Sequence, residues 1–385
     1  MSALSSSDKV PPDLNLFAGA GGLAIGLCEA GFGPFSLYEK DADACATLRH
    51  NVASDRPTLA GSVVEGDLTT VDWLDLPMPV RLLAGGVPCQ PFSQAGNHGG
   101  HEDLRNLFPD FLNAVRRLKP MGILVENVSG LSRDTHSEYF DYVRIQLEFP
   151  ALAPKPNEDW VEHKSRLEHL RESPGYHPTY DVYWQVVNAA DYGTPQKRKR
   201  VFVVAVRSGL GTYRFPEKTH SAVSLRREQS TGDYWKRHGV MQKNRPSLKK
   251  DDESQLILQP WVTTRDALVD VGEPAVTEAL ARFNHWTILG ARSYPGHTGS
   301  DPDWPSKAIK AGTHGVSGGE NTILEDEETI RYYTLREMAI IQGFPDRYLF
   351  KGARSSIIRQ IGNAVPPNLT KAIALPLARI FGATP

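Results

Sequence analysis

The residues with the clearest chemical potential lie in the segment GGVPCQPFSQAG, which contains Cys89, one of only three cysteines in 385 residues. A short apolar run, RLLAGG, comes directly before it and predicts a buried strand over 81–86. Proteins of the α/β class bind ligands where strands end in glycine- and proline-rich turns. A helix beginning near Gln90 would stabilise the thiolate form of Cys89, which is the reactive form. Because free cysteines are more often small buried apolar residues, this segment indicates a nucleophile without establishing one.

The other two cysteines, Cys28 and Cys45, fall in expected helices, and we predict that both pack in the interior. An odd number of cysteines without close spacing argues against a disulfide framework. The sequence has no Cys/His cluster with metal-ligand spacing, so no metal site is predicted.

A second segment of interest, LNLFAGAGGLAIGL, passes from an apolar run through a glycine-rich turn into a helical pattern. This is the usual arrangement around nucleotide cofactors, and Gly19, Gly21 and Gly22 allow the backbone to approach a ligand closely. The order of the glycines differs from G-x-G-x-x-G, so a dinucleotide is not specifically indicated. Glu39, at the end of the next expected strand, is placed to bind the ribose hydroxyls of a nucleotide cofactor. Asp67 ends a further expected strand, near the base of the same cofactor. Together these sites predict an adenosine-containing cofactor.

The elements that must hold these residues alternate between short apolar runs and longer amphipathic ones up to about residue 207. The expected strands are 13–17, 35–40, 81–86, 122–127 and 200–206, with a further strand ending at 65–67. The expected helices are 21–32, 41–51 and 105–120. Strands that alternate with helices predict an α/β fold with a parallel sheet covered on both faces.

One segment interrupts this alternation. Residues 156–173 predict an inserted helix of unknown role, capped by Asn157, with Trp160, Leu167 and Leu170 on one side.

The second half of the chain has a different character. From about 208 to 330 the periodicity weakens and Gly, Pro, Trp and basic residues dominate, which predicts a second, smaller, loop-rich domain. Helical periodicity returns in 332–344 and again after Pro366 and Pro367. Prolines suit the first turn of a helix, so these two are compatible with a helix that begins there. Pro376 should kink or shorten that last helix.

Composition is that of an ordinary globular protein, with 23% charged and 40% hydrophobic residues and a formal net charge of −2. From Gln196 to Lys250, however, 15 Lys and Arg stand against 3 Asp and Glu. This stretch is either a solvated basic face or a phosphate-binding surface. No run of 18 apolar residues exists, and the polar start MSALSSSDKVPPD lacks a signal-peptide core, so we expect a cytoplasmic protein without a membrane span.

Six short segments, in this order, resemble the motifs of the C5-cytosine DNA methyltransferase family: LFAGAGGL, GGVPCQPFS, VENV, QKRKR, TLREMAIIQGFPD and QIGNAVPP. Each is short enough to occur by chance, whereas six in the family's order, with a variable basic region between the fourth and the fifth, are specific. The resemblance implies a Rossmann-like S-adenosylmethionine-dependent methyltransferase domain with a mostly parallel sheet over 1–207. It also implies a smaller target-recognition domain over 208–330, with 331–385 returning to the catalytic domain.

The resemblance assigns expected roles to individual residues. Cys89 matches the catalytic nucleophile and Glu126 the catalytic glutamate, and Arg198 and Arg200 of QKRKR are expected to assist them. The residues expected to contact DNA are Gln90, Ser93, Gln196, Arg198 and Arg200. The residues expected to bind S-adenosylmethionine are Phe17, Ala18, Gly19, Gly21, Gly22, Leu23, Glu39, Lys40, Asp67, Leu68, Pro88, Leu107, Asn363 and Ala364.

The implied chemistry accounts for a reactive cysteine. Carbon 5 of cytosine is a weak nucleophile, and addition of the Cys89 thiolate at carbon 6 makes it reactive. Glu126 would protonate or hydrogen-bond N3 if burial keeps its carboxyl protonated, and Asn127 is expected to hold the loop. Arg200, together with Arg198, would bind the base's O2 or a phosphate. Because carbon 6 is attacked from above the ring, the base must leave the stack, with phosphate contacts offsetting the cost.

Three departures from the family pattern concern the cofactor site. Asn15 stands where many relatives carry Asp, Lys40 stands at an often apolar or aromatic position, and Val87 replaces a common proline. The methylene stem of Lys40 can still cover a ring. None of these changes touches Cys89 or Glu126.

Two alternatives remain open at the level of sequence. An RNA cytosine methyltransferase could use the same scaffold, although a variable region of roughly 120 residues favours duplex DNA. An inactive module that binds cofactor and DNA would not need Cys89, Glu126 and Arg200 together. The expected partners are double-stranded DNA and a restriction endonuclease acting on the same site, and we expect a monomer.

Overall fold

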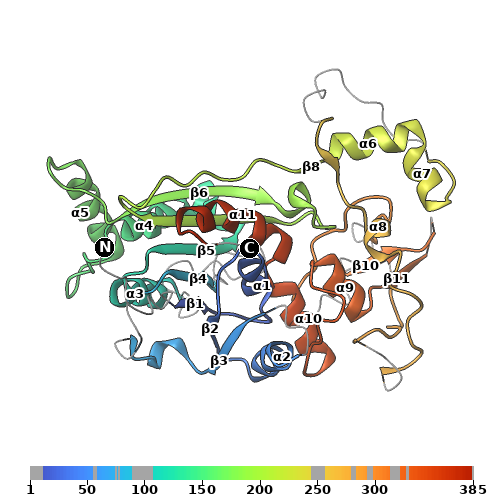
Figure 1. The fold of residues 1–385 in the computed structure, drawn as a ribbon, viewed down its shortest axis with the longest axis horizontal. Coiled ribbons are helices and arrows are strands. Elements are labelled where there is room, and N and C mark those ends of the chain that lie inside the picture. Colours follow the sequence, from blue (N-terminus) through green and yellow to red (C-terminus); the bar gives the residue numbers. More distant parts are fainter. Residues whose placement is uncertain are drawn as a thin grey trace, which may run out of the picture.

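The computed structural model describes residues 12–54, 59–73, 76, 79–88, 107–243, 256–278, 283–292, 298–312, 321–326 and 329–383. A seven-stranded sheet with the order β3-β2-β1-β4-β5-β7-β6 forms its centre (Figure 1). The strands are β1 (Asp13–Leu16), β2 (Phe35–Glu39), β3 (Gly61–Glu65), β4 (Leu82–Gly86), β5 (Gly122–Val128), β6 (Tyr180–Asn188) and β7 (Lys199–Arg207). The predicted α/β fold is confirmed.

The first five strands pair in parallel, and each was predicted from the sequence. Helices α1 (Gly22–Glu29), α2 (Ala42–Val52), α3 (Phe108–Leu118) and α4 (Ser137–Glu148) connect them or follow them. Each face of the sheet has its own apolar core. On one face α1 packs with Leu124 and Phe202, and on the opposite face α3 and α4 pack with Val125 and Val203. Because both faces are covered, β4 is apolar along its length, whereas β1 contains Asp13 and Asn15 and β5 contains Glu126 and Asn127 near its carboxyl end.

The last two strands run antiparallel, β7 against β5 and β6 against β7. The prediction of a mostly parallel sheet is confirmed, with β6 and β7 as its antiparallel strands. Strand β6 was not predicted from the sequence, although YDVYWQVVN is rich in the β-branched and aromatic residues of strands. As the edge strand, β6 leaves Trp184 and Val186 exposed, so it lacks the strict apolar alternation of a half-buried strand.

The inserted helix exists as α5 (Trp160–Glu172), but Asn157 does not cap it. Asp159 is the cap: its side chain accepts hydrogen bonds from the backbone N–H groups of Val161 and Glu162, and the Glu162 side chain completes a capping box. Asn157 has a φ of +64°, a turn conformation that asparagine tolerates.

In the described residues of the predicted region 208–330 the elements are short. They are β8 (His220–Ser221), α6 (Ala222–Thr231), α7 (Asp233–His238), β9 (Gln259–Pro260), α8 (Thr264–Leu268) and β10 (Thr322–Leu324). Leu225, Tyr234 and Trp235 form a small apolar core of their own, and α6 and α7 lie away from the sheet (Figure 1). Ile309 and Ile323 instead share the core of α1. The proposed boundaries of this domain stay a prediction.

The C-terminal segment packs back on the sheet domain, through β11 (Ile330–Tyr332), α9 (Leu335–Ile341), α10 (Arg354–Asn363) and α11 (Pro367–Ile380). Pro367 occupies the first turn of α11, as predicted, and the helix continues through Pro376 to Ile380, so Pro376 does not shorten it. No described helix combines the length and the apolar composition of a membrane-spanning segment.

Candidate active site

A cavity of about 540 Å³ opens at the carboxyl ends of the parallel strands. It is large enough for a small-molecule ligand. Every predicted cofactor residue except Gly21 lines this cavity, and so do Glu126, Arg198 and Arg200. The fold therefore brings the two predicted halves of the site, cofactor and chemistry, into one space.

The turn after β1 owes its shape to conformations that few residues adopt. Gly19 and Gly21 have φ of +54° and +85°, and Phe17, which lines the cavity, has a φ of +54°. A Cβ on Gly19 would meet no atom within 4 Å, so this position leaves room for a ligand. Gly21 serves packing instead, because a Cβ there would lie 2.9 Å from Leu48 Cδ2 and 3.0 Å from the Tyr348 hydroxyl.

Glu39 fixes this turn to the end of β2. Its Oε2 accepts a hydrogen bond of 2.7 Å from the Gly19 N–H, and its Oε1 accepts bonds of 2.9 Å from the N–H groups of Lys40 and Asp41. The carboxylate is thus oriented along the wall of the cavity, where it can accept hydrogen bonds from hydroxyl groups.

Asp67 lies on the same wall, at the start of the short 3-10 helix η1 (Leu68–Thr70). Its Oδ1 accepts hydrogen bonds from the backbone N–H and the hydroxyl of Thr69, which lower the pKa of Asp67. Asp110, in the first turn of α3, also lines the cavity, and burial raises its pKa. The sequence analysis missed Asp110; its place in a helix's first turn, just after Leu107, was the available signal.

Glu126 and Arg200 form an ion pair inside the cavity, with 2.8 Å between Arg200 Nε and Glu126 Oε1. Glu126 is only 7% exposed. Burial raises the pKa of the Glu126 carboxyl, and the charges of Arg200 and Arg198 partly counteract this shift. Burial likewise lowers the pKa of Arg200. Burial thus opposes ionisation of Glu126, and the Arg200 guanidinium holds its carboxyl in place, while a protonated Glu126 stays a prediction.

Asn127 connects the strand of Glu126 to the loop that leads to Cys89. Its Nδ2 donates a 3.0 Å hydrogen bond to the Val87 carbonyl, while its Oδ1 accepts one from the Val128 N–H. This is the loop-holding role expected for Asn127. Cys89 itself, with Gln90 and Ser93, lies outside the described residues.

Gln196 and Arg198 are both buried, and the DNA contacts expected of them stay a prediction. Gln196 is fully buried; its amide donates to the Ile341 carbonyl and to Gln342 Oε1, and its Oε1 accepts from the Ile309 N–H. It therefore cannot reach DNA in this conformation.

Arg198 is 2% exposed, and its guanidinium donates to the carbonyls of Ile309, Gly362 and Ala364. It lines the cavity but ties three chain segments together, and so it is placed to position the site rather than to bind a phosphate. Because Gly362 and Ala364 flank Asn363, these bonds also fix the cofactor wall.

One departure from the family pattern has a structural explanation. Asn15 is buried in β1 and donates from Nδ2 to the carbonyls of Leu16 and Ala84, at 3.2 and 3.3 Å. A carboxylate could not donate these bonds, so an amide suits this position.

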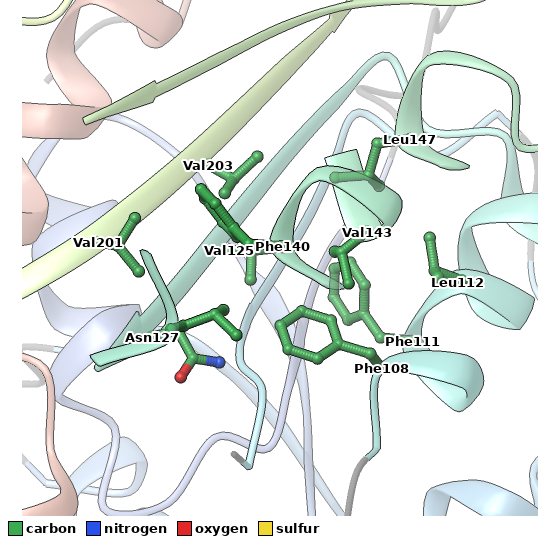
Figure 2. Close-up of a pocket in the computed structure, with 11 residues that line it drawn as sticks. Phe108, Phe111, Leu112, Val125, Asn127, Phe140, Val143, Leu147, Val201 and Val203 are labelled. Atoms are coloured by element: carbon green, nitrogen blue, oxygen red, sulfur yellow. The ribbon is translucent and has the colours of Figure 1, made fainter. Parts of the chain in front are cut away.

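A second, closed space is a packing gap. Apolar side chains of α3, α4, β5 and β7 surround a cavity of about 10 Å³, with Asn127 at its edge (Figure 2). This volume holds at most about one water molecule. The described residues contain no cluster of three or more His, Cys, Asp or Glu side chains suited to a metal ion.

Residues 13–149 and 161–379 match the family model of the C-5 cytosine-specific DNA methylases. The chain belongs to this family. Its enzyme class is therefore DNA cytosine-5 methyltransferase. The interval between the two matched stretches, 150–160, lies just before the body of helix α5.

Curated relatives of this methyltransferase include the Type II methyltransferase M.Eco47II of Escherichia coli, 32% identical over 95% of this chain and 78% of the relative. Another is M.PspPI of Psychrobacter sp. (strain TA137), 32% identical over 97% of this chain and 80% of the relative.

Solved structures support the fold. A DNA modification methyltransferase encoded within an E. coli prophage has a TM-score of 0.58 at 20% identity and covers 97% of this chain and 100% of that one. The S. pombe Dnmt2 methyltransferase has a TM-score of 0.56 at 18% identity, over 97% and 99% of the two chains.

Proposed function

We propose that this methyltransferase transfers a methyl group from S-adenosylmethionine to carbon 5 of a cytosine that is flipped out of a specific double-stranded DNA sequence, through a covalent adduct with Cys89. The observation that carries the proposal is the buried Glu126–Arg200 pair in the same cavity as the glycine turn and Glu39. A proton donor and a cofactor-binding wall in one space are what a cytosine methyltransferase requires.

The described residues fit S-adenosylmethionine. Gly19 leaves open space, Glu39 offers acceptors for ribose hydroxyls, and Leu68 and Lys40 supply apolar surface for the adenine. When bound, the cofactor supplies an electrophilic methyl group for carbon 5. Asn363 closes the site from the C-terminal segment, where Arg198 holds its neighbours.

In the proposed mechanism the Cys89 thiolate adds to carbon 6 of the cytosine. Electron density moves onto the ring, and a protonated Glu126 donates to N3 as this charge develops. Arg200 holds the Glu126 carboxyl and places its positive charge beside the base's O2. Once carbon 5 carries the methyl group, a solvent base takes the carbon 5 proton, the carbon 6–sulfur bond breaks to release the Cys89 thiolate, and the N3 proton returns to Glu126, which restores the aromatic ring.

Base flipping follows from the depth of the site. Glu126 is almost entirely buried inside the cavity, and a base stacked in a duplex cannot reach it. The target must leave the stack, which costs a few kcal/mol. Phosphate contacts offset that cost.

The wider setting of the proposed reaction follows from the family. We place recognition of the target sequence in 208–330. We also place the enzyme in the cytoplasm at the nucleoid, acting as a monomer beside a restriction endonuclease for the same site, because relatives are named Type II methyltransferases.

Transfer of tritiated methyl groups tests the proposal. The purified protein should label duplex DNA at cytosine in a defined sequence, and digestion should release 5-methylcytosine. Labelling of RNA without labelling of DNA would point to the RNA alternative. Cofactor binding without labelling of either would indicate a binding module.

A further inference from the structure

The cations of the basic stretch between Gln196 and Lys250 differ in whether they pair with an acid within the protein. Some are committed to acids within the protein: Lys218 pairs with Asp191 (2.9 Å), Arg237 with Glu228 (2.9 Å), and Lys243 with Asp303 (2.7 Å). Such cations neutralise buried or half-buried carboxylates, so they contribute little to binding an external anion. The phosphate contacts must come from other residues.

Lys197 is different because the fold sets a second lysine beside it. Gln196 and Ser306 form a parallel β-bridge, closed by hydrogen bonds of 2.9 Å from Lys197 N–H to the Ser306 carbonyl and 3.0 Å from Ser306 N–H to the Pro195 carbonyl. In a parallel pair the residues that follow the bridge are also neighbours with side chains on the same side. Lys197 of the catalytic part and Lys307 of the proposed recognition region each follow this bridge by one residue, and the charge of Lys307 acts on Lys197.

Lys197 has one cation and one acid in its electrostatic surroundings, Lys307 and Asp301. Neither Lys197 nor Lys307 makes an ion pair with a carboxylate in the part of the chain that the structure describes. Lys307 Nζ donates to the carbonyl and hydroxyl of Thr298, and the acid nearest to Lys197 in its electrostatic surroundings is Asp301. Burial and the charge of Lys307 lower the pKa of Lys197, as expected for two cations held together without a full counter-charge.

The position of the pair relates it to the active site. Lys197 lies two residues before β7, which carries Arg200 to the cavity, while Ser306 leads through Lys307 to Ile309, whose carbonyl Arg198 binds. An anion held between the two lysines would link the catalytic part to the segment 298–309. It would do so within three residues of Arg200.

We propose that Lys197 and Lys307 form a shared binding site for a single DNA phosphate, which fixes the duplex across the junction between the catalytic part and the recognition region. The site rests on the proposed function, since it takes DNA as the anion. A phosphodiester suits it because two ammonium groups present several donors to one compact charge, without the planar geometry that a carboxylate–arginine pair prefers.

The test is the salt dependence of DNA binding. Fluorescence anisotropy of a labelled duplex that supports methyl transfer gives Kd at several salt concentrations for the wild type, Lys197→Ala, Lys307→Ala and the double variant. The slope of log K against log salt falls by about 0.9 for each B-DNA phosphate that the protein no longer neutralises. For one shared phosphate, the double variant should therefore show a slope smaller by about 0.9 in total, and Lys197→Arg should keep the wild-type slope.

Lys164→Ala is the matched control, because Lys164 is a surface cation on α5, paired with Glu168, away from the cavity. It should leave the slope unchanged, and thermal unfolding of each variant identifies loss of folding. An unchanged slope in a folded double variant would overturn the proposal, and a decrease of about 1.8, the value for two phosphates, would overturn the single shared phosphate. Failure of the proposed function appears separately, as a wild-type protein that methylates no duplex.

Discussion

Arg200 Nε lies 2.8 Å from Glu126 Oε1, inside the cavity that also contains the glycine turn. The two residues are 74 positions apart and meet because β5 and β7 pair antiparallel, with Val128 opposite Arg200. Two opposing effects act on Glu126: burial favours its neutral form, whereas Arg200 and Arg198 favour its charged form, and the net shift of its pKa is upward. The upward shift makes the Glu126 carboxyl a better proton donor than an exposed glutamate at the same pH.

Glu126→Gln should lower the rate of methyl transfer by about 10²- to 10⁴-fold, the usual contribution of general acid catalysis. The amide keeps the shape and a donor but supplies no proton, so DNA binding should stay near that of the wild type. Single-turnover rates and Kd measured together separate the two effects. A variant with wild-type turnover would exclude Glu126 from the mechanism.

The same residue predicts a pH dependence. Because the pKa of Glu126 is raised, its protonated form persists above the ordinary range of a glutamate and is lost as pH rises through the shifted value. The wild-type single-turnover rate should therefore fall as pH rises through the shifted pKa, and the rate of Glu126→Gln should not show this fall. Identical pH profiles for the two proteins would show that proton donation by Glu126 does not limit the rate.

Cys89 should form a covalent complex with DNA that carries 5-fluorocytosine at the target. Fluorine cannot leave as a cation, so the adduct should persist in a denaturing gel and should require S-adenosylmethionine. Cys89→Ser should abolish it, because a serine hydroxyl is hardly ionised near neutral pH. Peptide mapping that placed the DNA on another residue would overturn this assignment.

The controls for this trapping are the other two cysteines. Cys28 lies in α1 and Cys45 in α2, and burial raises the pKa of both thiols, that of Cys45 to about 11. Such thiols are poor nucleophiles near neutral pH. Cys28→Ser and Cys45→Ser should leave the trapped complex unchanged.

Replacement of 208–330 by the matching region of a relative should change the methylated sequence and preserve the reaction. The small core around Tyr234 and Trp235 is separate from the cores that hold the cavity, whereas Ile309 and Ile323 belong to the core of α1, so the chimera should keep these two side chains. Sequencing that distinguishes 5-methylcytosine identifies the new target. Retention of the old target by an active chimera would place recognition elsewhere.

His163 should make the inserted helix sensitive to acid. Its ring is buried between the Tyr142 hydroxyl, at 2.7 Å, and the Leu152 carbonyl, at 2.8 Å, and burial lowers its pKa. The unfolded chain therefore binds the proton more readily, so this residue's contribution to stability is present above about pH 6.5 and is lost as pH falls below it.

His163→Gln should reduce the fall in Tm between pH 7 and pH 5, because glutamine does not titrate. At pH 7 the substitution should lower the free energy of unfolding by about 1–3 kcal/mol if the Tyr142 hydroxyl or the Leu152 carbonyl loses its hydrogen bond. If Tm fell equally in the wild type and the variant between pH 7 and pH 5, another group would control the acid sensitivity.

The sequence by itself determined the first five strands, the helices between them and most of the cavity wall. These features depend on local signals: apolar runs, glycines that permit a positive φ at Gly19, and acidic residues such as Glu39 at strand ends. Residues at the carboxyl ends of adjacent parallel strands meet at one edge of the sheet, whatever their separation along the chain.

Only the tertiary structure decided what the buried polar residues contact. Gln196 and Arg198 belong to a basic motif that predicts DNA contacts, yet both are buried and bind backbone groups of distant segments, including those at Ile309 and Gly362. Gly21 likewise serves packing against Leu48 rather than the cavity. The physical reason is that residue type fixes which hydrogen bonds a side chain can make, whereas burial and the approach of remote segments fix which partner it finds.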